Sequence, residues 1–179
     1  RNFTDPESRI MLTGHKSFEQ CFNAQAAVDA QEQIIVAVAV SQAASDAEQL
    51  ITMTDAVKRN CQGKPARVLA DAGYKSEANF LALEARQIDA CVALGRGENL
   101  PADVSASTPA TRRMARKLRS KTGRAHYKRR KAIVEPVFGW AKRVLGFRAF
   151  LLRGLHKVRG EWNLVCLALN LRRMNIKLR

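Results

Sequence analysis

The sequence predicts an α/β domain, and three observations lead to that prediction. Residues 23–96 alternate between β-rich runs and amphipathic segments in the order β-β-α-β-α-β, which is typical of α/β folds. The 179 residues are 46% hydrophobic, which suffices for a core and excludes wholesale disorder. No apolar run approaches the ~18 residues of a membrane-spanning helix, and the polar start does not resemble a signal peptide. We therefore expect one domain over residues 1–179.

The first predicted elements are a lead-in and a hairpin. Residues 1–22 are polar and include the turn-forming run at 4–8, so we expect an irregular segment. Residues 23–28 and 34–40 are β-rich and apolar, and a short polar break separates them. This arrangement predicts a β-hairpin whose second strand is largely buried.

Two helix–strand pairs complete the predicted core. Ser45 and Asp46 offer helix-start chemistry, and apolar residues continue at helical spacing as far as Asn60. Residues 67–70 then form a short strand. Ser76 caps a second helix, and residues 89–94 form the last strand of the core.

The character of the chain changes after residue 96. Residues 97–125 contain prolines, serines and many cations, and we expect a basic surface insertion or linker. Residues 126–179 form the helical part, with helices predicted over 126–145 and 155–176. The apolar residues of the last helix are expected to dock on the sheet, and they include Trp162, Leu164, Leu167, Leu169 and Leu171.

Positive charge is concentrated in the second half of the chain. Residues 1–98 hold 10 basic and 13 acidic residues, whereas residues 99–179 hold 21 basic and 3 acidic ones. Such asymmetry argues against a plain metabolic enzyme and points to a polyanionic partner, most often nucleic acid. A solvated, self-repelling segment is the alternative. The candidate phosphate-binding cations precede the predicted helical part and are Arg112, Arg113, Arg116, Lys117 and Arg119.

Asp71 is the first candidate catalytic residue. It directly follows the predicted strand 67–70, and the carboxyl end of a strand is where ligands and catalytic groups gather in α/β sheets. Gly73 allows a tight turn at this point. The alternative is an aspartate that only caps the next helix.

Glu135 is the second candidate, because it is an isolated carboxylate among cations. On a helix, Tyr127, Lys131, Glu135 and Lys142 share one face, which could hold a metal and a phosphate. The alternative is a solvated ion-pair face that contributes little stability. Pro136 disfavours helical backbone at Glu135, so we expect a kink or a helix start there.

Several stretches of the sequence resemble DDE-type transposases of bacterial insertion sequences. The matching residues are 4–11, 23–29, 69–74 and 127–139, and the resemblance covers nearly the whole chain. It implies a ribonuclease H-like α/β fold, which is a mixed sheet with flanking helices, followed here by the basic insertion and carboxyl-terminal helices. It also implies nucleotidyl transfer in DNA transposition.

The resemblance assigns roles to individual residues. Asp71 would be the second catalytic aspartate, and Glu135 the catalytic glutamate. The family's tyrosine–arginine–glutamate–lysine signature contacts DNA. Two residues could correspond to its arginine. Arg130 has the family's spacing from the tyrosine, with two residues between them, whereas Lys131 has the family's spacing to the glutamate, with three residues between them. The signature maps to Tyr127, Arg130 or Lys131, Glu135 and Lys142, and the shared helix face favours Lys131.

The first catalytic aspartate of the resemblance has no counterpart. In that fold it lies on the first strand, whereas the predicted hairpin fits the second and third strands. Among the aspartates that precede Asp71 we consider Asp5, Asp29 and Asp46, and we expect them in the lead-in, the hairpin turn and the helix cap. We therefore expect the first strand and its aspartate upstream of Arg1.

The resemblance implies metal-dependent phosphodiester cleavage and strand transfer at transposon ends. Three carboxylates would hold two Mg²⁺ (or Mn²⁺) ions, one activating a water or DNA 3′-hydroxyl and one stabilising the leaving oxygen. Because Asp71 and Glu135 alone would hold metal poorly, we expect this chain to bind DNA without cutting it.

Two other interpretations fit the same residues. One is a non-enzymatic, basic nucleic-acid-binding protein with an α/β core, and the other is a non-catalytic remnant of a transposase. In each case we expect double-stranded DNA as the partner and no membrane. Family analogy suggests a homodimer, without a heptad repeat to support it, in the bacterial cytoplasm near the nucleoid. The widely spaced cysteines predict reduced core residues.

Overall fold

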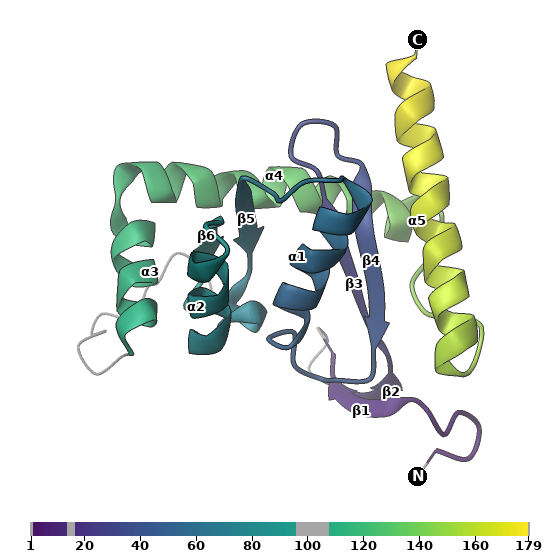
Figure 1. Ribbon diagram of the computed structural model, residues 1–179. Helices are drawn as coiled ribbons and strands as arrows, with labels where there is room; N and C mark the ends of the chain where they lie inside the picture. The colour runs from purple at the N-terminus through teal and green to yellow at the C-terminus, as the bar shows by residue number, and fades with distance from the viewer. Residues whose placement is uncertain (1, 14–16, 96–107, 179) are drawn as a thin grey trace. The chain divides into compact units, whose positions relative to one another are not determined.

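The computed structural model describes residues 2–13, 17–95 and 108–178 (Figure 1). The chain forms two compact units, one made of Arg1–Ala44 with Ile133–Arg179 and the other of Ser45–Ala132. Each unit has its own hydrophobic cluster. The single domain over residues 1–179 stays a prediction. The described strands pair two by two in three small sheets.

The first unit begins with a hairpin where the sequence predicted an irregular segment. β1 (Arg9–Leu12) and β2 (Phe18–Cys21) pair antiparallel, with Leu12 opposite Phe18. The prediction for residues 1–22 was wrong because these short strands show no alternation of apolar and polar residues, and the apolar side chains of Ile10, Leu12 and Phe18 are exposed. The preceding residues bind the start of the last helix, where the Gly154 N–H donates to Asp5 at 3.2 Å.

The core of the first unit lies between a second hairpin and the last helix. β3 (Asn23–Val28) and β4 (Ile35–Ser41) pair antiparallel, as predicted, and α5 (Leu155–Lys177) packs on β4. Trp162 lies at the centre of this core. Its Nε1 donates to the Gln25 carbonyl at 2.9 Å, and its ring stacks on Phe138.

α5 docks through one side of the helix. Trp162 and Leu169 are buried as predicted, whereas Leu164, Leu167 and Leu171 are exposed. The predicted docking of the apolar body of this helix is confirmed for one side only, because α5 is apolar on two sides and only one side of a helix can face β4.

The second unit contains a β-α-β element that ends at the candidate aspartate. α1 (Gln49–Asn60) comes first, followed by β5 (Arg67–Ala70), the 3₁₀ turn η1 (Ala72–Tyr74), α2 (Glu77–Ala85) and β6 (Asp89–Val92). β5 and β6 are parallel. Ser76 caps α2 as predicted, accepting from the Asn79 N–H at 3.0 Å, whereas α1 begins later than the sequence predicted.

Helices replace much of the predicted insertion. α3 (Pro109–Arg119) and the first residues of α4 (Lys121–Arg143) occupy the segment that the sequence predicted as an insertion or linker, and the rest of α4 lies in the helix predicted over 126–145. Residues 96–107 lie outside the described part. Pro109 stands at the helix start, where its missing N–H costs no hydrogen bond. The apolar residues of α3 recur at helical spacing and pack against the second unit's core; they are Ala110, Met114, Ala115 and Leu118.

α4 continues through Pro136, where the sequence predicted a kink or a helix start. A proline inside a helix removes one hydrogen bond and crowds the preceding turn. Tertiary packing sustains the helix here, because Ile133 and Ala141 are buried on either side of the proline. None of the described helices combines the length and apolar character needed to cross a bilayer.

Candidate functional site

Asp71 lies directly after the carboxyl end of β5. Its backbone is extended, and its Oδ1 accepts a hydrogen bond from the Gly73 N–H at 2.9 Å. Asp71 therefore caps the short turn η1, as the alternative interpretation of the sequence expected. This bond fixes one carboxylate oxygen, while Oδ2 makes no hydrogen bond to the residues that the structure describes.

A second carboxylate, that of Asp46, lies beside Asp71. A Cβ atom placed on Gly73 would be 2.6 Å from Asp46 Oδ2 and 3.1 Å from Asp71 Oδ1. The two carboxylate oxygens therefore lie close to the place that a Gly73 Cβ would occupy, and they can come this close because glycine has no Cβ atom. This pairing could not be predicted from the sequence, because Asp46 precedes α1 and Asp71 follows β5.

Tyr74 reports the electrostatics of this region. Its side chain packs against the core of the second unit. Burial raises the pKa of Tyr74, and the negative charges of Asp46 and Asp71 raise it further. The phenol therefore stays protonated at neutral pH.

Glu135 and the residues predicted to accompany it lie in α4. Tyr127, Lys131, Glu135 and Lys142 belong to this one helix, as their predicted spacing required. Glu135 is exposed and forms no ion pair within the described residues. Asp71 belongs to the unit Ser45–Ala132, and Glu135 to the segment Ile133–Arg179 of the other unit. Their predicted convergence on a metal stays a prediction.

Arg130 and Lys131, the two candidates for the signature cation, have different surroundings. The guanidinium of Arg130 lies over the Tyr127 ring, 5.6 Å from its centroid, in a cation–π arrangement. Arg130 is half-buried, and its Nε has no hydrogen-bond partner among the described residues. Lys131 is exposed. Arg130 is therefore the cation that Tyr127 holds in place, and Lys131 is the one open to solvent.

The cations of α3 fall into two groups. Arg113 makes a bidentate ion pair with Glu84 of α2, with distances of 2.9 Å and 2.6 Å, and Lys117 pairs with Asp89 of β6. These two residues anchor α3 to its own unit. The others predicted to contact phosphate lie on exposed positions of α3 and are Arg112, Arg116 and Arg119.

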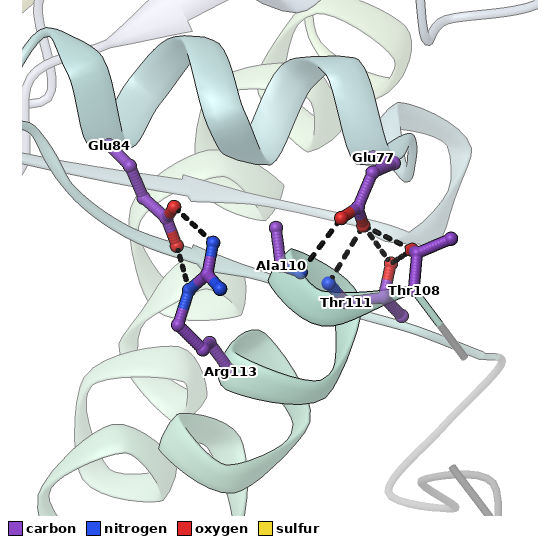
Figure 2. Close-up of polar contacts among 6 residues, drawn as sticks. All are labelled: Glu77, Glu84, Thr108, Ala110, Thr111 and Arg113. Atoms are coloured by element: carbon purple, nitrogen blue, oxygen red, sulfur yellow. Dashed lines mark hydrogen bonds and ion pairs between the residues drawn. The ribbon is translucent and has the colours of Figure 1, made fainter. Parts of the chain in front are cut away.

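Glu77 fixes the start of α3, and Figure 2 shows this contact. Its Oε1 accepts from the Ala110 N–H at 2.7 Å, and its Oε2 accepts from the Thr111 N–H at 2.9 Å and from the Thr108 hydroxyl. A carboxylate suits the positive end of a helix. Sequence reasoning missed this contact, although Thr108 before Pro109 is a recognisable helix start.

The carboxylates around α3 are held ionised. Desolvation raises the pKa of Glu77, but hydrogen bonds from Thr108, Ala110 and Thr111 outweigh it and bring the pKa from 4.5 to about 2. The hydrogen bond from Arg113, aided by its positive charge, lowers the pKa of Glu84. A basic helix is thereby tied to α2 by acidic side chains.

The described residues contain no group of three or more His, Cys, Asp or Glu side chains that could hold a metal. The four cysteines are free; Cys91 and Cys166 are buried, whereas Cys61 is exposed. Asp46 and Asp71 are a pair of carboxylates that the fold brings together from separate segments.

A comparison with known families gives a match over most of the chain. A family model described as "Transposase DDE domain" matches residues 6–171. No curated protein and no solved structure matches the chain. The matched residues include all of the unit Ser45–Ala132 and most of the other unit, and with them Asp71, Glu135 and the basic helices.

Proposed function

Because the chain belongs to the family of transposase DDE domains, we propose that it acts in metal-dependent cleavage and strand transfer of DNA at transposon ends. In this proposal it supplies Asp71 as the second aspartate and Glu135 as the glutamate of the catalytic triad. The observation that carries the proposal is the position of Asp71, which follows a parallel strand and lies beside a second carboxylate.

The donor set at Asp71 fits a hard divalent cation. Mg²⁺ and Mn²⁺ bind carboxylate oxygens, and Asp71 Oδ2 makes no hydrogen bond to described residues. Asp71 and Glu135 would hold the ion, and Asp46 adds negative charge next to Asp71. When bound, such an ion stabilises negative charge on the reacting phosphate oxygens. Asp71 itself is held in position by the Gly73 N–H.

The ribonuclease H-like sheet is part of the same proposal. Support comes from two elements that a mixed sheet requires, which are the antiparallel pair β3–β4 and the parallel pair β5–β6 joined by α2. Of the earlier aspartates, Asp5 and Asp29 accept backbone hydrogen bonds in turns and caps. Asp46 is the one shown next to Asp71.

The basic helices are proposed to bind the DNA backbone. The proposed contacts are non-specific in sequence, because arginine and lysine side chains on helices α3 and α4 meet phosphates rather than base edges. Tyr127 would orient Arg130 through the cation–π contact, and Lys131 would reach a phosphate directly. A DNA substrate would bring the protein to the nucleoid.

Metal binding tests the catalytic assignment. We would titrate Mn²⁺ into the chain and follow free Mn²⁺ by electron paramagnetic resonance. Asp71→Asn and Glu135→Gln are each expected to weaken binding by about tenfold or more, since losing even an outer-shell partner of a metal site costs that much. Asp55→Asn is the matched control, because Asp55 pairs with Arg86 away from this site.

A second candidate function is binding of DNA without catalysis, and the charge of the second half of the chain favours it. The same titration separates the two. If Asp71→Asn and Glu135→Gln both weaken Mn²⁺ binding, the two residues share a metal and the catalytic proposal stands. If neither variant, or one of them only, changes Mn²⁺ affinity, the catalytic proposal fails and DNA binding alone remains.

A further inference from the structure

The segment that joins α4 to α5 presents two exposed leucines. It consists of residues 144–154, which we call the connecting loop, and it belongs to the unit that contains β3 and β4 (Figure 1). Leu151 is 86% exposed and Leu152 is 48% exposed. Single apolar side chains are common on protein surfaces, so exposure alone assigns no role to them. The way in which their backbone is held and the charge around them do.

One carboxylate fixes the backbone of both leucines. Glu161 of α5 accepts from the Leu151 N–H with its two oxygens, at 2.9 Å and 3.1 Å, and from the Leu152 N–H at 3.0 Å. The end of the connecting loop is fixed as well, since the Gly154 N–H donates to Asp5 at 3.2 Å. The leucines are therefore carried by an ordered backbone.

Aromatic side chains anchor the same loop to its unit. The rings of Phe147 and Phe150 meet edge to face with centroids 5.4 Å apart, and Phe147 stacks on Trp162 at 5.8 Å. Phe150 also meets Phe22 of the unit's core at 6.5 Å. The aromatic residues of the loop thus pack against the core, while its leucines stay in solvent. A ligand of the leucines would meet a loop that is already ordered, which lowers the entropic cost of binding.

The sequence around the leucines is basic. Residues 136–160 contain no acidic residue and six cations, which are Lys142, Arg143, Arg148, Arg153, Lys157 and Arg159. Arg148 and Arg153 flank the leucines, are exposed, and make no hydrogen bond or ion pair with the residues that the structure describes. The carboxylates that contact this segment each accept from its backbone N–H groups, and they are Asp5, Glu7 and Glu161. The unpaired cations favour a polyanion as the partner.

The two arginines lie near the leucines along the chain. Because a residue spans at most about 3.6 Å, the Arg148 Cα lies within about 11 Å of the Leu151 Cα, and the Arg153 Cα lies within about 7 Å of it. The minor groove of B-form DNA is about 6 Å wide. Long arginine side chains at these distances reach the phosphates that border a groove entered by Leu151.

We propose that the connecting loop inserts Leu151 into the minor groove of duplex DNA, with Arg148 and Arg153 on the bordering phosphates. Leucine is among the apolar residues that part neighbouring base pairs from the minor groove and kink the duplex. The proposal rests on DNA as the partner, as in the proposed function. It adds a bend in the duplex, which phosphate contacts by the basic helices do not require.

Bending of a short duplex tests the insertion, with a donor fluorophore on one end and an acceptor on the other. The unchanged chain is expected to raise energy transfer, because a kink brings the two ends together. Leu151→Asn, which places a polar side chain of similar size in the groove, should abolish most of this rise, whereas Leu151→Met should keep it. Leu164→Asn is the matched control, because Leu164 is a 68% exposed leucine of α5 outside the connecting loop. Circular dichroism of each variant checks that the helices persist.

The salt dependence of affinity for the same duplex tests the two arginines. Arg148→Gln and Arg153→Gln should each lower the slope of log affinity against log salt by about 0.9, and Leu151→Asn should leave the slope unchanged. Equal energy transfer with the unchanged chain and with Leu151→Asn would overturn the proposal, as would unchanged slopes in both arginine variants. All these measurements are made in EDTA. Their outcome is therefore distinct from that of the Mn²⁺ titration of Asp71 and Glu135.

Discussion

Glu77, at the first position of α2, accepts a hydrogen bond from the backbone N–H of Ala110 at 2.7 Å and so caps a helix that begins more than thirty residues later. The same carboxylate accepts from the Thr111 N–H. An acidic side chain from one helix thus satisfies the amides at the start of the basic helix α3. The position of the α3 cations depends on this contact.

Glu77→Ala should lower the thermal midpoint of the second unit by several degrees, because two amides at the positive end of α3 lose their acceptor. Glu48→Ala is the control, since Glu48 is exposed and its side chain caps nothing. Differential scanning calorimetry of both variants measures the change. Equal midpoints for the two variants would show that α3 does not depend on this carboxylate.

Acid should destabilise the second unit through the same residue. The pKa of Glu77 is about 2 in the folded chain against an ordinary value of 4.5, so ionised Glu77 stabilises the fold fully above pH 4.5. That contribution is lost as the pH falls from 4.5 towards 2. The lowered pKa of Glu84 acts in the same direction.

Urea unfolding at a series of pH values would test this dependence. In Glu77→Gln the loss of stability between pH 4.5 and 2 should be smaller than in the unchanged chain, because the variant has no carboxyl group to protonate at that position. Identical pH profiles for the two proteins would contradict the assignment.

Within the β-α-β element, the sequence predicted the local features and missed a long-range contact. β5, the cap at Ser76 and the position of Asp71 were all predicted, because each depends on residues that are close together along the chain. The bond from α3 to Glu77 was not predicted. It joins residues that only the tertiary fold brings together.

The cations of α3 illustrate the same limit. Composition predicted a basic segment, yet it cannot tell Arg113, which is paired with Glu84, from Arg116, which is exposed. The number of charged residues can be counted in the sequence, but whether a given arginine forms an ion pair depends on which side of α3 faces α2. The approach of Asp46 to Asp71 was missed for a related reason, because a strand and a helix separate them in the sequence.

Gly73→Ala should disturb the aspartate pair while leaving the core intact. A Cβ at this position would lie 2.6 Å from Asp46 Oδ2 and 3.1 Å from Asp71 Oδ1, so at least one carboxylate has to move. Mn²⁺ affinity should fall if these carboxylates contribute to a metal site. Gly63→Ala is a close control, because its Cβ would meet nothing nearer than 3.9 Å. Unchanged Mn²⁺ affinity in Gly73→Ala would show that Asp71, as positioned here, does not bind the ion.

Arg116 and Arg113 should differ in how their loss affects DNA binding. Arg116→Gln removes an exposed cation and should reduce the slope of log affinity against log salt by about 0.9 if Arg116 meets one phosphate. Arg113→Gln breaks the ion pair with Glu84, so its main effect should be on thermal stability. Fluorescence anisotropy with a labelled duplex at several salt concentrations measures the slopes. The slope should change more in Arg116→Gln than in Arg113→Gln, because a cation already paired with a carboxylate releases fewer counterions from DNA. The reverse order would mean that Arg113 leaves Glu84 to bind phosphate, and that α3 meets DNA through the side that now faces α2.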